Sequence, residues 1–275
     1  MSDFLKSMAE SSAARAAMVS GNFSASELDS PVVELALRGF DVIAEIKDAS
    51  PSEGALATAA ADRGLRAKQY SAGGAAAISV LTEPLRFAGD IAHLREVVSA
   101  VSGEGIPVMR KDFLVEPVQI LEARAAGASG VLLIAAMLSE AKLRSMLDCA
   151  YDHSLFVLLE AFDESDLQRC TSLLAEDRHQ RQAAQSKLLI GINTRNLRTL
   201  EVDPGRLATL AMLLPPNAIC VAESGLVNED DAAVAAALGY RVALVGTALM
   251  RSSDPVTLIA GMCASGRRRL AEQAC

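Results

Sequence analysis

Eight short apolar runs recur along the chain at a regular interval. They begin at Phe40, Ala75, Pro107, Gly130, Leu155, Leu188, Ala218 and Val242, so that successive starts lie roughly 23 to 35 residues apart. Each run is rich in Val, Ile and Leu without strict alternation, which is typical of strands buried on both faces of a parallel sheet. The interval accommodates one strand and one helix, and the pattern therefore predicts eight strand–helix units.

Helical patterns fill the intervals between the runs. Apolar residues recur at three- and four-residue spacing in the segments 90–102, 117–128, 139–153, 203–215 and 228–240. Several of these segments begin with a Pro, Asp, Asn or Ser suited to a helix start. Eight such units favour an α/β fold closed into a single (β/α)₈ barrel, a TIM barrel. A doubly wound open sheet is the alternative, because periodicity does not show closure.

Two segments lie outside the repeat. Residues 1–39 predict an N-terminal extension of one or two amphipathic helices, with Phe4, Leu5 and Met8 on one face, and residues 40–275 predict the barrel, in one domain with that extension. The polar stretch 175–185 has no core pattern, and we expect a solvated loop or a longer fifth helix there. His179 within it is expected at the surface.

Composition limits the class of protein. Hydrophobic residues make up 51% of the 275 residues and charged residues 22%, as expected for a compact protein. The net charge of −8 argues against nucleic-acid partners. Five scattered cysteines have no metal-ligand or redox spacing, and no apolar run has the length of a signal peptide or a membrane span. We expect a cytoplasmic protein without membrane partners, metal or cofactor; for its oligomeric state we expect a monomer, with a weak homodimer as the alternative.

Polar side chains interrupt the apolar runs at their carboxyl ends. These residues are Glu45, Lys47, Lys111, Glu160, Asn193, Arg195 and Glu223. In a barrel the carboxyl ends of all strands meet at one mouth, where active sites of this fold lie. Unpaired buried charges are costly, so the two lysines and three glutamates need one another or a wet cavity. Such a cluster separates the pKa values of its members and favours acid–base chemistry.

Glycines follow the last two strands. Ser224 and Gly225 come after the seventh run, and Gly246 and Thr247 end the eighth. Barrels commonly bind phosphate through backbone N–H groups in these two loops, and glycine lets the main chain approach the oxygens. The pair of loops therefore predicts a phosphate site.

At these residues the sequence resembles the indole-3-glycerol-phosphate synthase family. The matching stretches, in the family's order, are IAEIKDASPSEG, ISVLTEP, PVMRKDFLVEP, EARAAGASGVLLIAA, GINTRNLRTLEVD, VAESG and LVGTALM, and they cover nearly all of residues 42–255. The resemblance implies a carboxy-lyase of tryptophan biosynthesis. Its substrate would be 1-(o-carboxyphenylamino)-1-deoxyribulose 5-phosphate, converted to indole-3-glycerol phosphate by ring closure with loss of carbon dioxide and water.

The resemblance also implies roles for individual residues. Lys111 would protonate the ribulose carbonyl oxygen, Lys47 would hold the substrate carboxylate, and Glu160 would assist dehydration. Glu45, Asn193 and Glu223 would support them by hydrogen bonds, and Arg195 would order the mouth. The phosphate would lie among Ser50, Ser224, Gly225, Gly246 and Thr247. Phe113 and Leu132 would pack on the aromatic ring.

The sequence departs from the family pattern at four positions. Asp48 and Glu53 stand where the family usually has basic residues, Asn196 replaces an aspartate, and Phe162 replaces a histidine. We expect the two acids near Ser50 to weaken phosphate binding. They leave open a paralogue that acts on a substituted anthranilate derivative in a secondary pathway.

Two rival functions on the same fold are less favoured by the sequence. A phosphoribosylanthranilate-isomerase-like barrel would need a cysteine at an early strand end, and the five cysteines begin only at Cys149. A non-catalytic binding barrel would be expected to lose Lys111 or Glu160, and both are present. The synthase is therefore the function that the sequence favours.

Overall fold

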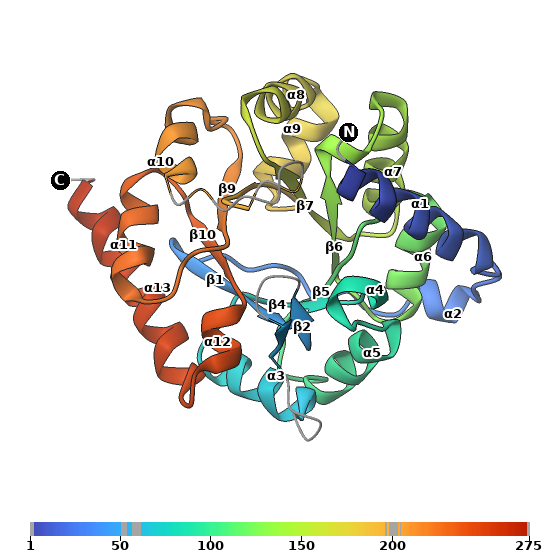
Figure 1. The fold of residues 1–275 in the computed structure, drawn as a ribbon, viewed down its shortest axis with the longest axis horizontal. Coiled ribbons are helices and arrows are strands. Elements are labelled where there is room, and N and C mark those ends of the chain that lie inside the picture. The colour runs from blue at the N-terminus through green and yellow to red at the C-terminus, as the bar shows by residue number, and fades with distance from the viewer. Residues whose placement is uncertain are drawn as a thin grey trace.

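The strands form a closed barrel. A computed structural model describes residues 3–50, 54–56, 62–195, 197, 203 and 205–273. Within these residues eight parallel strands close on themselves (Figure 1): β1 (Asp41–Ile46), β4 (Ala77–Leu81), β5 (Val108–Lys111), β6 (Gly130–Ile134), β7 (Phe156–Ala161), β8 (Leu188–Asn193), β9 (Ile219–Glu223) and β10 (Val242–Val245). Each of the eight apolar runs contains one of these strands. The predicted (β/α)₈ barrel is confirmed, and the open sheet is excluded.

The strand register brings the polar strand ends to one level. Lys111 pairs with Leu81 of the neighbouring strand, Glu160 pairs with Gly191, and Asn193 pairs with Glu223. All strands are parallel, so these positions lie at the same end of the barrel.

Helices surround the barrel as a ring in Figure 1. Their bounds are α3 (Arg63–Ala72), α4 (Pro84–Phe87), α5 (Ile91–Ala100), α6 (Pro117–Ala125), α7 (Glu140–Asp152), α8 (Glu164–Leu174), α9 (Asp177–Ala184), α10 (Arg206–Leu210), α11 (Glu229–Ala237), α12 (Thr247–Arg251) and α13 (Pro255–Gln273), with 3₁₀ turns η1 (Ala135–Met137) and η2 (Ala211–Leu213). Side chains of Asp90, Ser139 and Asn228 accept hydrogen bonds from backbone N–H groups in the first turn of α5, α7 and α11, where a helix has no partners of its own.

Strand residues alternate between two cores. Val42, Ala44 and Ile46 face the helices, whereas Ile43 joins the interior of the barrel. The interior cluster also contains Leu5 and Met8 of α1 (Asp3–Met18), so the N-terminal extension shares its core with the barrel. A short hairpin, β2 (Ala49–Ser50) and β3 (Gly54–Ala55), follows β1 and contacts α4.

The N-terminal extension spans both ends of the barrel. Helix α1 contacts η1 and is joined to α6 by the hydrogen bond between Gln119 and Ser12, and α2 (Ala25–Leu28) follows it (Figure 1). The chain then runs without regular structure to β1. Along this path Val33 N donates to Ser129 Oγ, and the Arg124 guanidinium donates to the carbonyl and hydroxyl of Ser30. The sequence predicted one or two helices in this segment, and the structure has two.

The polar stretch 175–185 differs from the expectation for His179. It forms the separate helix α9, which packs against α8 and β8. His179 is 3% exposed, and its Nδ1 lies 3.3 Å from the Tyr151 hydroxyl. Burial lowers the pKa of this histidine. The expected surface histidine is therefore buried, because α9 turns its less polar side toward the barrel.

No helix in the described part of the chain is long and apolar enough to span a bilayer.

Candidate active site

Lys111 lies between two buried glutamates at the mouth of the barrel. Its Nζ is 3.3 Å from Glu160 Oε2 and 3.7 Å from Glu223 Oε2. Both glutamates are almost fully buried, and the Lys111 side chain is 15% exposed. The three residues come from the ends of β5, β7 and β9, and Lys111 and Glu160 are 49 positions apart in the sequence. The predicted convergence of strand-end charges is confirmed for this trio.

Asn193 orders one side of the trio. Its Nδ2 donates to Glu160 Oε1 at 3.2 Å, and its Oδ1 accepts from Ser224 Oγ at 2.8 Å and from the Arg195 backbone N–H at 2.9 Å. Asn193 is therefore hydrogen-bonded to Glu160, and its supporting role in the reaction stays a prediction. The Ser224 hydroxyl proton is directed at Asn193, so a direct contact of Ser224 with substrate stays a prediction.

Glu45 and Lys47 form a second charged pair. Glu45 Oε1 lies 2.8 Å from Lys47 Nζ, and the two side chains are 5% and 14% exposed. Gly246, at the end of β10, leaves the space for this pair. A Cβ on Gly246 would overlap the Glu45 carboxylate and lie 3.0 Å from Lys47 Nζ. Gly246 therefore makes room for the Glu45–Lys47 pair, and its contact with a phosphate stays a prediction.

The site holds charges whose protonation depends on one another. Burial would lower the pKa of Lys111, but the charges of Glu160, Glu223 and Glu45 outweigh it and raise that pKa. Burial, followed by the charge of Glu160, raises the pKa of Glu223 well above the usual value for a carboxyl, although Lys111 acts against this. Neither Glu223 oxygen has a hydrogen-bond donor among the described side chains. A proton on Glu223 would be donated to Glu160 and would remove the repulsion between the two carboxylates.

Apolar side chains line the mouth next to Lys111. Phe113 is 5% exposed, and its ring lies 6.0 Å from the Phe4 ring and 6.2 Å from the Phe87 ring, measured between centroids. Leu132, on β6, belongs to the same interior cluster. Aromatic rings and a leucine at the entrance suit a flat aromatic ligand, and the contact of Phe113 and Leu132 with such a ligand stays a prediction.

The residues predicted to bind phosphate come from separate loops. Gly225 has φ +80° after β9, and Gly246 and Thr247 lead into α12 after β10. Ser50 lies in the β2–β3 hairpin, which contacts α4, the helix after β4. The β9 and β10 loops are neighbours in the barrel, whereas the closeness of Ser50 to them stays a prediction.

Asp48 does not have the role expected from the sequence. Its carboxylate receives both Nε and Nη2 of Arg63, the first residue of α3, and Nδ1 of His93 lies 3.8 Å away. The charge of Asp48 is therefore compensated by Arg63, and the expectation that Asp48 weakens phosphate binding stays a prediction. Glu53 and Asn196 lie outside the described residues.

Two residues important for the site were not predicted. Gly191 lies beneath Glu223, and a Cβ there would overlap the Glu223 carboxylate. Asp112, which follows Lys111, is 2% exposed and accepts hydrogen bonds from Arg15, Thr82, Arg110 and the Phe113 N–H. In the sequence, Asp112 could have been found as a charged residue that directly follows the strand-end lysine and faces the opposite side. Gly191 could have been found as a glycine inside an apolar strand.

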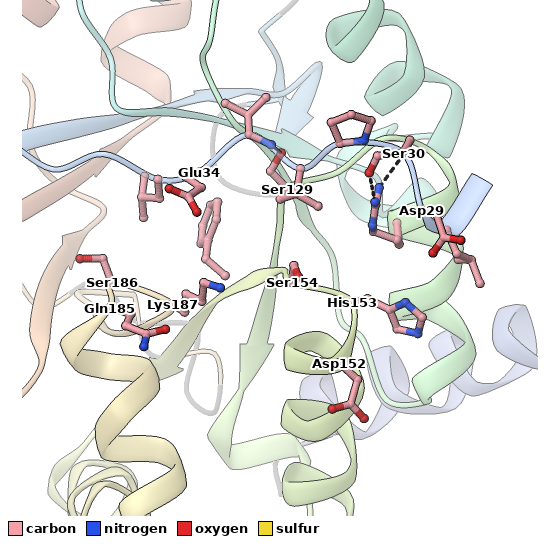
Figure 2. A pocket seen from close by; sticks show the side chains of 17 residues that line it. Asp29, Ser30, Glu34, Ser129, Asp152, His153, Ser154, Gln185, Ser186 and Lys187 are labelled. Carbon is pink, nitrogen blue, oxygen red and sulfur yellow. Dashed lines mark hydrogen bonds between the residues drawn. The ribbon is translucent and has the colours of Figure 1, made fainter. Parts of the chain in front are cut away.

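A large cavity lies at the opposite end of the barrel (Figure 2). It has a volume of about 720 Å³ and lies between residues 28–35 of the extension and the turns that precede β6, β7 and β8. Lys187, His153 and Arg124 line it together with acidic residues of the extension, including Glu34. Catalytic groups of this fold lie at the carboxyl ends of the strands. The Lys111 mouth, and not this cavity, is therefore the candidate active site.

The described residues contain no group of three or more His, Cys, Asp or Glu side chains arranged to hold a metal ion. Burial raises the pKa of Cys170 and Cys220 to about 12, so neither thiol is a ready base at neutral pH.

Comparisons with known proteins identify the family of the chain. The chain matches the family model described as indole-3-glycerol phosphate synthase over residues 18–262. It is 44% identical over 225 residues to the indole-3-glycerol phosphate synthase of Nocardioides sp. (strain JS614), covering 82% of this chain and 80% of that protein. It is 43% identical over 228 residues to indole-3-glycerol phosphate synthase 1 of Streptomyces coelicolor, covering 83% and 79%.

Solved structures show the same fold at low sequence identity. Thiamine phosphate pyrophosphorylase from Pyrococcus furiosus has a TM-score of 0.58 at 13% identity, covering 84% of this chain and 97% of that one. 3-Hexulose-6-phosphate synthase from Salmonella typhimurium has a TM-score of 0.57 at 14% identity, covering 85% and 99%. These likenesses concern the fold alone. The family match and the curated relatives decide the family: the chain belongs to the indole-3-glycerol phosphate synthase family.

Proposed function

We propose that this protein converts 1-(o-carboxyphenylamino)-1-deoxyribulose 5-phosphate to indole-3-glycerol phosphate, with Lys111 as the general acid of ring closure. The observation that carries the proposal is the buried contact of Lys111 with Glu160 and Glu223 beside an apolar ring-binding wall. Family membership supports the substrate class.

The first step forms a carbon–carbon bond. The ring carbon that bears the carboxylate attacks the ketone carbon of the ribulose chain, and the ketone oxygen takes a proton from Lys111. The alkoxide oxygen formed in this attack is a stronger base than the lysine amine. Transfer of the proton from Lys111 to this oxygen is therefore favourable even though the pKa of Lys111 is raised. The nearby carboxylates keep Lys111 protonated until that oxygen accepts its proton.

The later steps release carbon dioxide and water. Loss of carbon dioxide returns its bonding electrons to the ring. The hydroxyl group then leaves as water after it gains a proton, while the neighbouring carbon loses one. Glu223, whose pKa is raised, is the carboxyl able to give the leaving hydroxyl its proton, and Glu160 assists by taking the proton from the neighbouring carbon. Lys47, held by Glu45, binds the substrate carboxylate. The N–H groups near Gly225 and Gly246 bind the phosphate.

One assay tests the proposal. The protein contains no tryptophan, so indole fluorescence reports product without a background from the enzyme. Purified protein incubated with the substrate should develop this fluorescence, and Lys111→Met should not. Absence of the signal from folded wild-type protein would overturn the activity. A faster reaction with a ring-substituted substrate would instead support the paralogue.

A further inference from the structure

Helix α1 is attached by an ion pair to Asp112, which directly follows Lys111 at the end of strand β5. Arg15, near the end of α1, donates from Nη1 to Asp112 Oδ2 at 2.8 Å and from Nη2 to Asp112 Oδ1 at 2.7 Å. The Asp112 side chain is fully buried, and the Arg15 side chain is 25% exposed. Two parallel charge-assisted hydrogen bonds of this kind fix both distance and orientation.

Asp112 connects this pair to the backbone around Lys111. Its Oδ1 accepts the Phe113 N–H at 2.8 Å, and its Oδ2 accepts the Thr82 hydroxyl at 2.8 Å. Thr82 in turn donates its backbone N–H to the Lys111 carbonyl at 3.0 Å. The main chain on both sides of Lys111 is therefore held through one carboxylate. Successive strand residues face opposite sides, so Lys111 points into the mouth while Asp112 points toward α1.

A second polar contact joins α1 to the same loop. Gln119 Nε2 donates to Ser12 Oγ at 2.9 Å, while Gln119 Oε1 accepts the N–H groups of Val115 at 2.9 Å and Glu116 at 3.0 Å. Ser12 and Gln119 are both buried. Ser12 and Arg15 are three residues apart and lie on one face of α1, on which Met8 is also buried.

We propose that Arg15 is a positioning residue for the reaction: it aligns Lys111 and Phe113 through Asp112. The effect that we expect on kcat rests on the proposed function. Arg15 is 97 positions from Asp112 in the sequence, and it contacts Asp112 on the side of the chain opposite to the Lys111 side chain. Loss of Arg15 would leave Asp112 with donors from Thr82, Arg110 and Phe113 only, and the turn would lose its ionic link to α1.

The variants are Arg15→Met, Arg15→Lys and the control Lys6→Met. Met keeps length and helix propensity. Lysine keeps the charge but replaces the guanidinium fork by a point charge, so it should restore part of the effect. Lys6 lies on the same helix and is exposed, so Lys6→Met removes one positive charge from α1 without touching the loop.

Kinetics give the first result. Misplacement of a catalytic group by about 1 Å costs up to about a hundredfold in rate, so Arg15→Met should lower kcat by about tenfold to a hundredfold. Arg15→Lys should lie between it and wild type, and Lys6→Met should match wild type. A kcat of Arg15→Met within twofold of wild type would overturn the proposal. A change in KM alone would also overturn it, since α1 would then only cover bound substrate.

Hydrogen exchange gives the second result and needs no activity. In Arg15→Met, amides of residues 111–116 should exchange faster than in wild type and in Lys6→Met, with circular dichroism as the folding control. Faster exchange confined to residues 3–18 would overturn the proposal, because Arg15 would then only anchor its own helix. If wild type lacks activity, the proposed function fails while this measurement still tests the coupling.

Discussion

Replacement of Lys111 by methionine tests the centre of the site. The ammonium lies 3.3 Å from Glu160 Oε2 and 3.7 Å from Glu223 Oε2. At an effective dielectric constant of about 20, Coulomb's law assigns each of these contacts about 5 kcal/mol. Loss of hydration on burial of the three groups offsets much of this attraction, so the net change in stability is smaller.

Activity and stability should respond differently to Lys111→Met. Without its acid, the ring-closure step should slow by about 10²–10⁴-fold in kcat. The two glutamates would then face each other without a cation, so the free energy of unfolding should fall below that of wild type as pH rises. Product fluorescence gives kcat, and thermal melts at several pH values followed by circular dichroism give stability.

Two further variants separate the chemistry from the fold. Lys111→Arg keeps the positive charge but holds its proton more tightly, so it should fold like wild type and still be slow. Lys187→Met removes a lysine that precedes β8 at the other end of the barrel and should leave kcat unchanged (Figure 2). A Lys111→Met protein with more than half of the wild-type kcat would refute the assignment of Lys111 as the acid.

Variants at Glu223, Gly191 and Gly246 test the surroundings of the lysine. Because burial raises the pKa of Glu223, its contribution to stability is present below the ordinary carboxyl pKa of 4.5 and declines as pH rises toward the higher folded-state value. The free energy of unfolding of Glu223→Gln, measured by thermal melts, should therefore increase relative to that of wild type from pH 5 to 9. The increase should be about 1.4 kcal/mol for each unit by which the fold raises the Glu223 pKa, and a difference that stays constant with pH would contradict this. Gly191→Ala should displace the Glu223 carboxylate and lower kcat by about tenfold to a hundredfold, measured by product fluorescence; unchanged kcat would show that the carboxylate has room to move. Gly246→Val should overlap the Glu45 carboxylate and raise KM while lowering kcat, and an effect on KM alone would leave only a phosphate role for Gly246.

The spacing of apolar runs was sufficient to predict the barrel. Eight runs at nearly equal intervals correspond to the eight strands, because a parallel strand buried on both faces leaves a continuous apolar signature. The charged ends of those runs were sufficient to place Lys111, Glu160 and Glu223 together. Parallel strands all point the same way, so the same end of each run reaches the same mouth.

Pairings between distant residues were decided by tertiary structure alone. Asp48 looked like an unpaired acid near a phosphate, but it binds Arg63, which the first helix after β1 brings alongside it. His179 looked exposed because its neighbours are polar, yet α9 packs that side of the helix against Tyr151. Local composition reports the average exposure of a segment and not the partner of a given side chain.

The coupling of α1 to the active site shows the same limit. Arg15 and Asp112 are 97 residues apart, and nothing in the pattern around either one indicates the other. Likewise, the raised pKa of Glu223 arises from its burial beside Glu160, which depends on the closure of the barrel. The sequence by itself determined which residue types stand at the strand ends, since periodicity and strand direction are local properties. Only the folded chain decided their protonation and their partners, because both depend on distances between segments that are remote in sequence.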